Sequence, residues 1–256
     1  LLGCQNAPAP ARASVDCAAV RLRHPARVDQ TCRRLCRRRD RLAECAANLS
    51  EARKLAGPRL STEVESHLAE LGMAGARLVV DIAPFDGGHE IASKAGTFRI
   101  GRNGLDRVEF LIASNPGEPP RPLVKVASGG EVSRVMLSLK LALAGTDSVP
   151  TMVFDEIDSG VSGRVAEAVG MKLKKLSETR QTLVVTHLPQ IAALADRHFS
   201  ARKIVEGNRT RTGLVVLDRA GREEELAALL SGGTVTETAR AHARALLDAC
   251  TGGSSR

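Results

Sequence analysis

The stretch Thr151-Met152-Val153-Phe154-Asp155-Glu156 places a short, mostly apolar run directly before two acids. Such a run predicts a buried strand whose carboxyl end carries both carboxylates, and ligands of parallel sheets bind at that end. One carboxylate can hold Mg²⁺, usually through water, while the other can orient and deprotonate a water molecule. Two solvated acids after a strand give the same pattern, so both interpretations stay open for this stretch alone.

A glycine pair lies upstream, in Ser128-Gly129-Gly130-Glu131. It precedes a helical pattern whose apolar residues share one face, namely Val132, Val135, Met136, Leu139 and Leu143. Backbone N–H groups at the N-terminus of such a helix can face an anion. A glycine turn before a helix is the commoner explanation when this pattern occurs alone.

A second apolar run, Thr182-Leu183-Val184-Val185, leads into Thr186 and His187, 31 residues after Glu156. A histidine at a strand end can bond a γ-phosphate or an attacking water, although a single such histidine is more often structural. Neither Asp155 nor His187 has zinc-ligand spacing.

The elements predicted around these motifs alternate between strand and helix, which indicates an α/β fold with a parallel sheet flanked by helices. Besides the motif strands, we predict helices over 60–71 and 165–176, strands at 77–83 and 108–112, a loop over 86–105 with a short strand at 97–100, and final strands near 205 and at 214–217. Two helices close the chain; the first ends at Gly232-Gly233 and the second begins with a capping box at Thr234-x2-Glu237.

Composition narrows the class of protein. The chain has 256 residues and is 43% apolar, which excludes wholesale disorder. No apolar run is long enough to predict a membrane span. The first residues form no signal peptide and contain no Met, which indicates a fragment or an incomplete reading frame. Five Phe with no Trp or Tyr argue against single-strand binding by base stacking.

Residues 1–50 differ in composition from the rest of the chain. They contain ten Arg, no Lys, four acids and five of the six cysteines. The Arg33–Arg39 cluster can contact phosphates or form a solvated helix face. A leucine every seven residues, at Leu35, Leu42 and Leu49, is a weak heptad signal. The pair Cys32 and Cys36 can be a metal or redox pair, but zinc spacing is missing, so free thiols are favoured.

Together, in this order and spacing, the three motifs resemble the signature motif, Walker B strand and switch histidine of ABC-type ATPases. Flanking segments narrow the resemblance to the RecN family of bacterial DNA repair proteins, relatives of the SMC proteins. These segments are 115–123, 154–163, 185–192, 195–198 and 224–247. The resemblance runs from about Glu51 to Leu247, and Ser162 helps to identify it, because SMC and transporter ATPases usually have an aspartate there.

The resemblance implies a role for each motif residue. Glu156 would be the catalytic carboxylate, His187 the switch histidine, and Asp155 the acid that holds Mg²⁺ through water. Binding of ATP held by a second head would fall to Ser128, Gly129, Gly130 and Glu131. Asp158 would lie in the D-loop, residues 157–163, which crosses the interface of a head dimer.

The resemblance also implies an architecture. Residues 51–256 would be the C-terminal lobe of a P-loop NTPase-like head. Residues 1–50 show no clear match to the family, and we expect a basic Cys/Arg-rich segment or a coiled-coil remnant there. The family repairs double-strand breaks by recombination, binds DNA as a homodimer of heads, and acts in the cytoplasm on the nucleoid, away from membranes. No Gly-x4-Gly-Lys-Ser/Thr occurs in the chain. The Walker A lobe is therefore missing, and we expect the isolated chain not to hydrolyse ATP.

Two other functions compete with this one. The first is a non-catalytic DNA-binding or dimerisation module that uses the basic residues 1–50. The second is an ABC transporter ATPase subunit, against which Gly160-Val161-Ser162-Gly163 and the proline-rich segment before the signature motif both argue.

Overall fold

The structure, a computed structural model, describes residues 25–93, 96–126, 128–146, 149–206, 209–232 and 234–251. The first 24 residues of the predicted segment 1–50, and Gly233, lie outside the described residues. Contacts divide the chain into two compact units, residues 1–53 with 83–107 and residues 54–82 with 108–256. Each unit is described by itself below.

The described part of the first unit combines a helix with a hairpin. Helix α1 runs from Pro25 to Glu70 and contributes its residues up to Arg53. The hairpin pairs β2 (His89–Ser93) with β3 (Gly96–Ile100) in antiparallel register. Strand β3 was predicted at 97–100, whereas β2 was wrongly predicted as loop. Its short, largely exposed sequence shows no apolar alternation, and backbone pairing with β3 makes it a strand.

A buried carboxylate holds the hairpin segment to α1 within this unit. Asp106 accepts hydrogen bonds from Ser50 Oγ at 2.7 Å and from the Arg53 guanidinium at 3.1 Å. Its side chain is 7% exposed, so both bonds form largely out of water.

The second unit contains the rest of α1 and most of a three-stranded sheet. Strands β1 (Arg77–Pro84), β4 (Asp106–Ala113) and β5 (Arg121–Pro122) lie in the order β1-β4-β5, with a 3-10 turn following at Leu123–Lys125. Apolar residues of α1, the sheet and the next helix form one core, which contains Val64, Leu68, Met73, Ala76, Leu78, Ile112, Val135 and Leu139.

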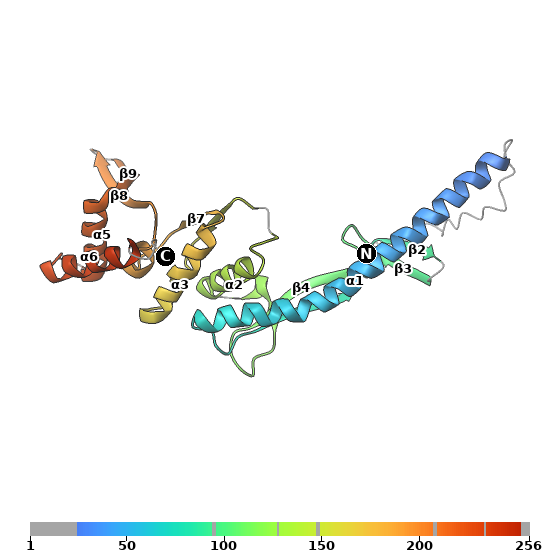
Figure 1. The fold of residues 1–256 in the computed structure, drawn as a ribbon, viewed down its shortest axis with the longest axis horizontal. Coiled ribbons are helices and arrows are strands. Elements are labelled where there is room, and N and C mark those ends of the chain that lie inside the picture. The colour runs from blue at the N-terminus through green and yellow to red at the C-terminus, as the bar shows by residue number, and fades with distance from the viewer. Residues whose placement is uncertain are drawn as a thin grey trace, which may run out of the picture. The chain divides into compact units, whose positions relative to one another are not determined.

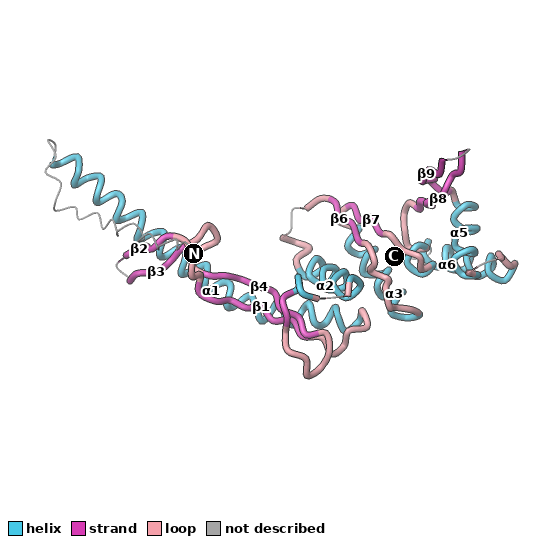
Figure 2. Tube along the Cα trace, turned by 180° about the vertical axis from the view of Figure 1, so that it is seen from behind, coloured by secondary structure: helices cyan, strands magenta, loops and turns pink. Residues whose placement is uncertain are grey.

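The predicted strand-helix alternation follows in the same unit (Figure 1). Its elements are α2 (Gly129–Ala142), β6 (Thr151–Phe154), α3 (Gly163–Ser177), β7 (Gln181–Val184) and the short α4 (Pro189–Ala192). Strands β6 and β7 pair in parallel and run side by side in Figure 2. The predicted α/β class with parallel strands is therefore confirmed.

A second core fixes these elements around β6. Met152 and Phe154 pack with Leu137 of α2, Val169 of α3 and Ile191 of α4, and all of these residues are buried. Residues of β6 alternate between exposed and buried, so one side of the strand serves this core while Val153 points elsewhere.

The C-terminal part comprises a hairpin and two helices. Strands β8 (His198–Glu206) and β9 (Arg209–Leu217) are antiparallel, and α5 (Arg219–Ser231) packs against α6 (Glu237–Thr251) through a third core. As predicted, α5 ends at Gly232, which is left-handed. The capping box at Thr234 is wrong, because Thr236 Oγ1 accepts the Ala239 N–H and Glu237 already lies in the helix.

The parallel pair has an exposed apolar face. Val153 is 66% exposed and Val185 60% exposed, and Leu183 is also exposed. Parallel sheets are usually covered on both faces. Among the described residues, β7 pairs with β6 alone and β8 with β9 alone. Within the described residues, no helix is both long and apolar enough to cross a membrane.

Candidate functional site

The predicted glycine pair lies at the start of α2. Ser128 is its N-cap, and Ser128 Oγ accepts the Glu131 N–H at 3.4 Å. The helix has 14 residues, so its N-terminal N–H groups carry the partial positive charge of a full helix. Glu131 lies in the first turn, and its carboxylate accepts the Ser114 hydroxyl at 2.6 Å.

Both glycines lie close against the segment that follows β6. A Cβ on Gly129 would meet Glu156 Oε2 at 2.1 Å, and a Cβ on Gly130 would meet the Ser159 carbonyl oxygen at 2.9 Å. The Walker B-like segment thus packs directly on the N-terminus of α2. The sequence predicts that these residues share one phosphate site, and the fold brings Gly129, Gly130 and Glu156 together.

The two acids after β6 are placed by an unusual turn. Glu156 has a φ of +57°, the left-handed region that non-glycine residues avoid, and no other described non-glycine residue has a positive φ. Asp155 Oδ1 accepts the Glu156 N–H at 2.9 Å, while the Asp155 carbonyl accepts Ser133 Oγ at 2.8 Å. Both acids are exposed.

His187 follows β7, and a buried acid holds it. Asp158 Oδ2 lies 3.0 Å from His187 Nδ1 and accepts the His187 backbone N–H at 2.9 Å and the Thr186 hydroxyl at 2.6 Å. The imidazole remains 73% exposed. The structure therefore joins His187 to Asp158, and Glu156 to the glycine pair.

Arg134 and Thr186 are contributors that sequence analysis did not assign. Arg134 is 7% exposed and donates to the Ser159 carbonyl at 2.9 Å, which ties α2 to the segment after Glu156. Burial lowers the pKa of Arg134, and nearby Glu131 opposes that shift. The spacing of four between Gly130 and Arg134 places both on one helix face, which is the signal that could have indicated Arg134.

The donor set fits a magnesium ion held partly by other ligands. No group of three or more His, Cys, Asp or Glu side chains able to hold a metal occurs among the described residues. Mg²⁺ in nucleotide sites typically takes one or two protein carboxylates and completes its shell with water and phosphate oxygens. The exposed carboxylates of Asp155 and Glu156 suit that mode and do not suit a closed metal site.

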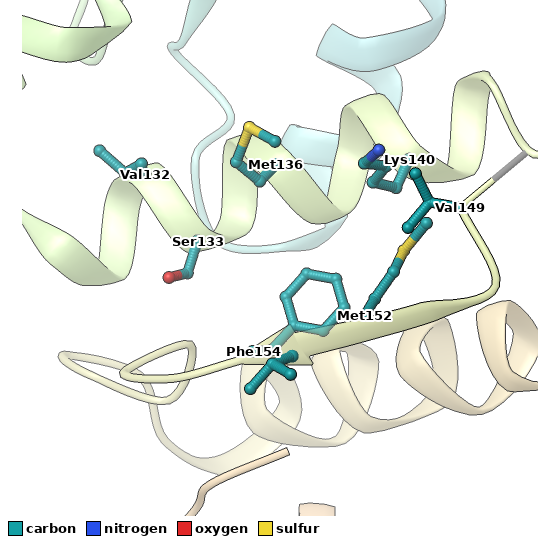
Figure 3. Close-up of a pocket in the computed structure, with 8 residues that line it drawn as sticks. Val132, Ser133, Met136, Lys140, Val149, Met152 and Phe154 are labelled. Carbon is teal, nitrogen blue, oxygen red and sulfur yellow. The ribbon is translucent and has the colours of Figure 1, made fainter. Parts of the chain in front are cut away.

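An open groove lies beside these residues, between α2 and β6. It has a volume of about 260 Å³ and is mostly apolar, with Ser133 at one end (Figure 3). Its lining residues are Val132, Ser133, Met136, Lys140, Val149, Met152, Val153 and Phe154.

Comparison with curated proteins finds relatives that share most of this chain. This chain is 44% identical to the DNA repair protein RecN of Xylella fastidiosa (strain Temecula1). The 204 aligned residues cover 80% of this chain and 35% of that protein. The chain is also 44% identical to RecN of Streptomyces coelicolor, in an alignment that covers 82% of this chain. It is 37% identical to RecN of Bacillus subtilis, in an alignment that covers 79% of this chain. These identities confirm the predicted resemblance to RecN. The chain spans about a third of the length of these relatives.

Comparison with solved structures finds heads of SMC proteins. The Smc head domain with a coiled coil and joint from Pyrococcus yayanosii aligns over 71% of this chain and 30% of that one, with 18% identity and a TM-score of 0.47. The SMC head domain from Thermotoga maritima aligns over 68% of this chain and 52% of that one, with 22% identity and a TM-score of 0.34. No family model matches the chain.

Proposed function

We propose that this RecN-like chain is the C-terminal lobe of an ATPase head that acts in DNA double-strand break repair and recombination. The observation that carries the proposal is the packing of Glu156, in its left-handed turn, on the glycine pair that starts α2. A strained residue at a strand end beside a helix N-terminus is typical of sites that position a reacting group. The sequence similarity to RecN proteins supports the same function.

Each motif residue has a role in this proposal. Mg²⁺ and ATP, when bound, supply the phosphate chain and much of the charge that neutralises it. Asp155 holds the metal, through water, and Glu156 accepts a proton from the attacking water. The helix N-terminus at Ser128, Gly129 and Gly130 faces phosphate oxygens of ATP held by a second head, next to Glu131. His187 offers a ring nitrogen to the γ-phosphate, and Asp158 lies in the segment that reaches the dimer interface.

The exposed apolar face of the sheet supports the proposal that a partner lobe covers it. Val153, Leu183 and Val185 present apolar surface where parallel sheets are normally covered. The Walker A sequence is absent from the chain, which spans about a third of its relatives. We infer that the Walker A lobe of the complete protein covers this face, and that the chain alone does not hydrolyse ATP.

A chimaera tests the catalytic part of the proposal. In Xylella fastidiosa RecN, the segment that aligns with this chain is replaced by residues 51–256. The chimaera should bind and hydrolyse ATP, whereas Glu156→Gln should bind ATP and lose at least about 100-fold in turnover, the usual contribution of a general base. Glu167→Gln, on the exposed surface of α3, is the matched control and should keep full turnover.

Two results would contradict the proposal. Normal turnover by the Glu156→Gln chimaera would remove Glu156 from catalysis. A folded chimaera that binds no ATP would overturn the assignment of this segment to a nucleotide-binding head.

The partners follow from the same proposal. Leu35, Leu42 and Leu49 recur every seven residues on α1 and are all exposed, so α1 offers a seam to a second helix of a coiled coil. The complete protein would act as a homodimer of heads on DNA, in the cytoplasm at the nucleoid.

A non-catalytic DNA-binding module remains the alternative, and one observation favours it. Arg33, Arg34, Arg37, Arg38 and Arg39 are all exposed on α1. Phosphate contacts by these arginines would make DNA affinity fall steeply with salt. Changing Arg34, Arg37 and Arg38 to Gln would then weaken binding and flatten that salt dependence. Unchanged affinity and slope would exclude the role.

A further inference from the structure

Two neighbouring side chains of α2 donate hydrogen bonds to the turn that follows β6, residues 155–159. Ser133 Oγ donates to the Asp155 carbonyl at 2.8 Å, and Figure 3 shows Ser133 on the side of α2 that faces the end of β6. Arg134 Nη1 donates to the Ser159 carbonyl at 2.9 Å. Helix α2 therefore holds the first and the last residue of this turn.

The spacing along α2 explains why these two donors reach the same turn as the glycine pair. Residues four apart share a helix face. Gly129 is thus in line with Ser133. Gly130 is in line with Arg134, and a Cβ on Gly130 would meet the Ser159 carbonyl oxygen at 2.9 Å, the atom to which Arg134 donates. One face of α2 therefore makes room for the turn with its glycines and holds the turn with its donors.

A guanidinium in this place carries a cost for stability. Arg134 is 7% exposed, and burial lowers the pKa of its guanidinium from the ordinary value. Its Nε is buried and has no hydrogen-bond partner among the described residues. A buried charge disfavours folding unless its partners compensate. Side chains that are kept at such a cost are typical of functional sites.

The turn has to be held, because its backbone is strained. Glu156 has a φ of +57°, which a non-glycine residue keeps only where the surrounding structure imposes it. Phe154 before it and Ile157 after it are buried, and the Glu156 carbonyl accepts the Ser159 N–H at 3.0 Å. These contacts anchor the turn in its own core. The two donors of α2 are the hydrogen bonds that tie it to the helix of the glycine pair.

We propose that Ser133 and Arg134 are positioning residues for Glu156: they hold its left-handed turn against α2 and so keep its carboxylate at the N-terminus of that helix. Both act through backbone carbonyls of the turn, so neither is a catalytic residue. That the carboxylate activates water rests on the proposed function. That two donors impose the turn concerns this chain alone and is measured without nucleotide.

Denaturant unfolding of the full chain tests the proposal with two substitutions of Glu156. Glu156→Ala keeps the strain of a left-handed residue, whereas Glu156→Asn relieves much of it, so their equilibrium constants for unfolding should differ about fivefold. Adding Ser133→Ala and Arg134→Met should bring this ratio close to one, because a turn that is no longer held can leave the left-handed region. Comparing the ratio in two backgrounds isolates the coupling between the donors and the turn.

Matched variants separate a held turn from a general loss of packing. Ser133→Thr keeps a hydroxyl and should keep the full ratio. Arg222→Met also removes a guanidinium that donates to backbone carbonyls, those of Ala193 and Ala195, but it does so from α5 and should leave the ratio unchanged. If the chain with both changes in α2 does not fold, Ser133→Ala alone should still lower the ratio.

Three results of the unfolding measurement would overturn the proposal. A ratio close to one in the otherwise wild-type chain would mean that there is no strain for the donors to impose. An unchanged ratio in the folded chain with Ser133→Ala and Arg134→Met would show that the buried neighbours alone hold the turn. A ratio that falls equally in Arg222→Met would show that the effect is not specific to α2.

The chimaera gives a second measurement. There the same two changes in α2 should lower kcat by about tenfold or more, because a displaced carboxylate no longer meets the water, while the KM for ATP changes little. Undiminished turnover would overturn the positioning role. A chimaera that is inactive before any change in α2 would contradict the proposed function instead, and the unfolding ratio would still decide what Ser133 and Arg134 do.

Discussion

The carboxylate of Glu156 occupies the space that a side chain on Gly129 would need, with Oε2 at 2.1 Å from the position of that Cβ. Gly129→Ala should therefore displace the carboxylate, which can rotate away, and change the free energy of unfolding by no more than about 1 kcal/mol. Turnover of the chimaera should fall strongly. Thermal unfolding and ATPase assays of the same variant measure the two effects separately, and full turnover with Ala at this position would contradict the packing.

Gly130→Ala should behave differently, because its Cβ would meet the Ser159 Cβ and carbonyl oxygen at 2.9 Å. Backbone must shift to relieve this contact, which should destabilise the chain by about 1–3 kcal/mol. Gly145→Ala has nothing within 4 Å of its Cβ and serves as the control in denaturant unfolding. Equal stability of the two variants would show that α2 does not pack closely on the segment after Glu156.

The left-handed turn at Glu156 predicts that stability depends on which residue replaces this glutamate. Ala at this position keeps the strain of a φ of +57°, while Asn tolerates that region far better. Glu156→Asn should therefore be more stable than Glu156→Ala by roughly 1 kcal/mol. Both variants should be inactive in the chimaera. Melting temperatures compare them, and an Ala variant as stable as Asn would argue against the turn.

Substitution of Asp106, the buried acid of the first unit, should destabilise that unit. Asp106→Ala leaves Ser50 and Arg53 without their acceptor and should cost about 2–3 kcal/mol, less than a fully buried pair because Arg53 is 26% exposed. Ser50→Ala should cost only about 1 kcal/mol. Denaturant unfolding measures both, with the exposed Glu90→Ala as control. A reversed order would refute the arrangement.

Stability of the second unit should fall as the solution becomes acidic. Lys172 Nζ lies 2.9 Å from His67 Nδ1, and an ammonium can only donate, so His67 must accept with that nitrogen unprotonated. Burial, and then Lys172, lower the pKa of His67 from its usual 6.5. Just below pH 6.5 the unfolded chain therefore binds a proton that the folded chain does not, and the free energy of unfolding decreases as pH falls.

Variants isolate this pH effect. His67→Gln should remove part of the loss between neutral and mildly acid pH. A remainder should persist, because burial and Arg222 lower the pKa of His198 in the same direction. The exposed His242→Gln is the control and should reproduce the wild-type profile. A profile identical in His67→Gln and wild type would contradict the Lys172 contact.

Sequence pattern was sufficient for the strand at 151–154 and the alternation around it, because apolar runs and helical stripes report burial directly. It did not predict the left-handed φ of Glu156, since nothing in the periodicity specifies the turn that follows a strand. The contact of Asp158 with His187 joins residues on two separate loops, so only the parallel pairing of β6 with β7 brings them together. The hairpin strand β2 was missed because pairing, not burial, defines it.

The exposed face and the strand edges of the short parallel sheet affect how prone this chain is to aggregate in a cell. Among the described residues, β6 and β7 pair only with each other, and unpaired strand edges beside exposed Val153 and Val185 are templates for intermolecular strand addition, the first step of aggregation. If the Walker A lobe proposed above covers this face, a chain without it would depend on chaperones or be degraded. The abundance of the chain would then follow the supply of that lobe more than its own synthesis.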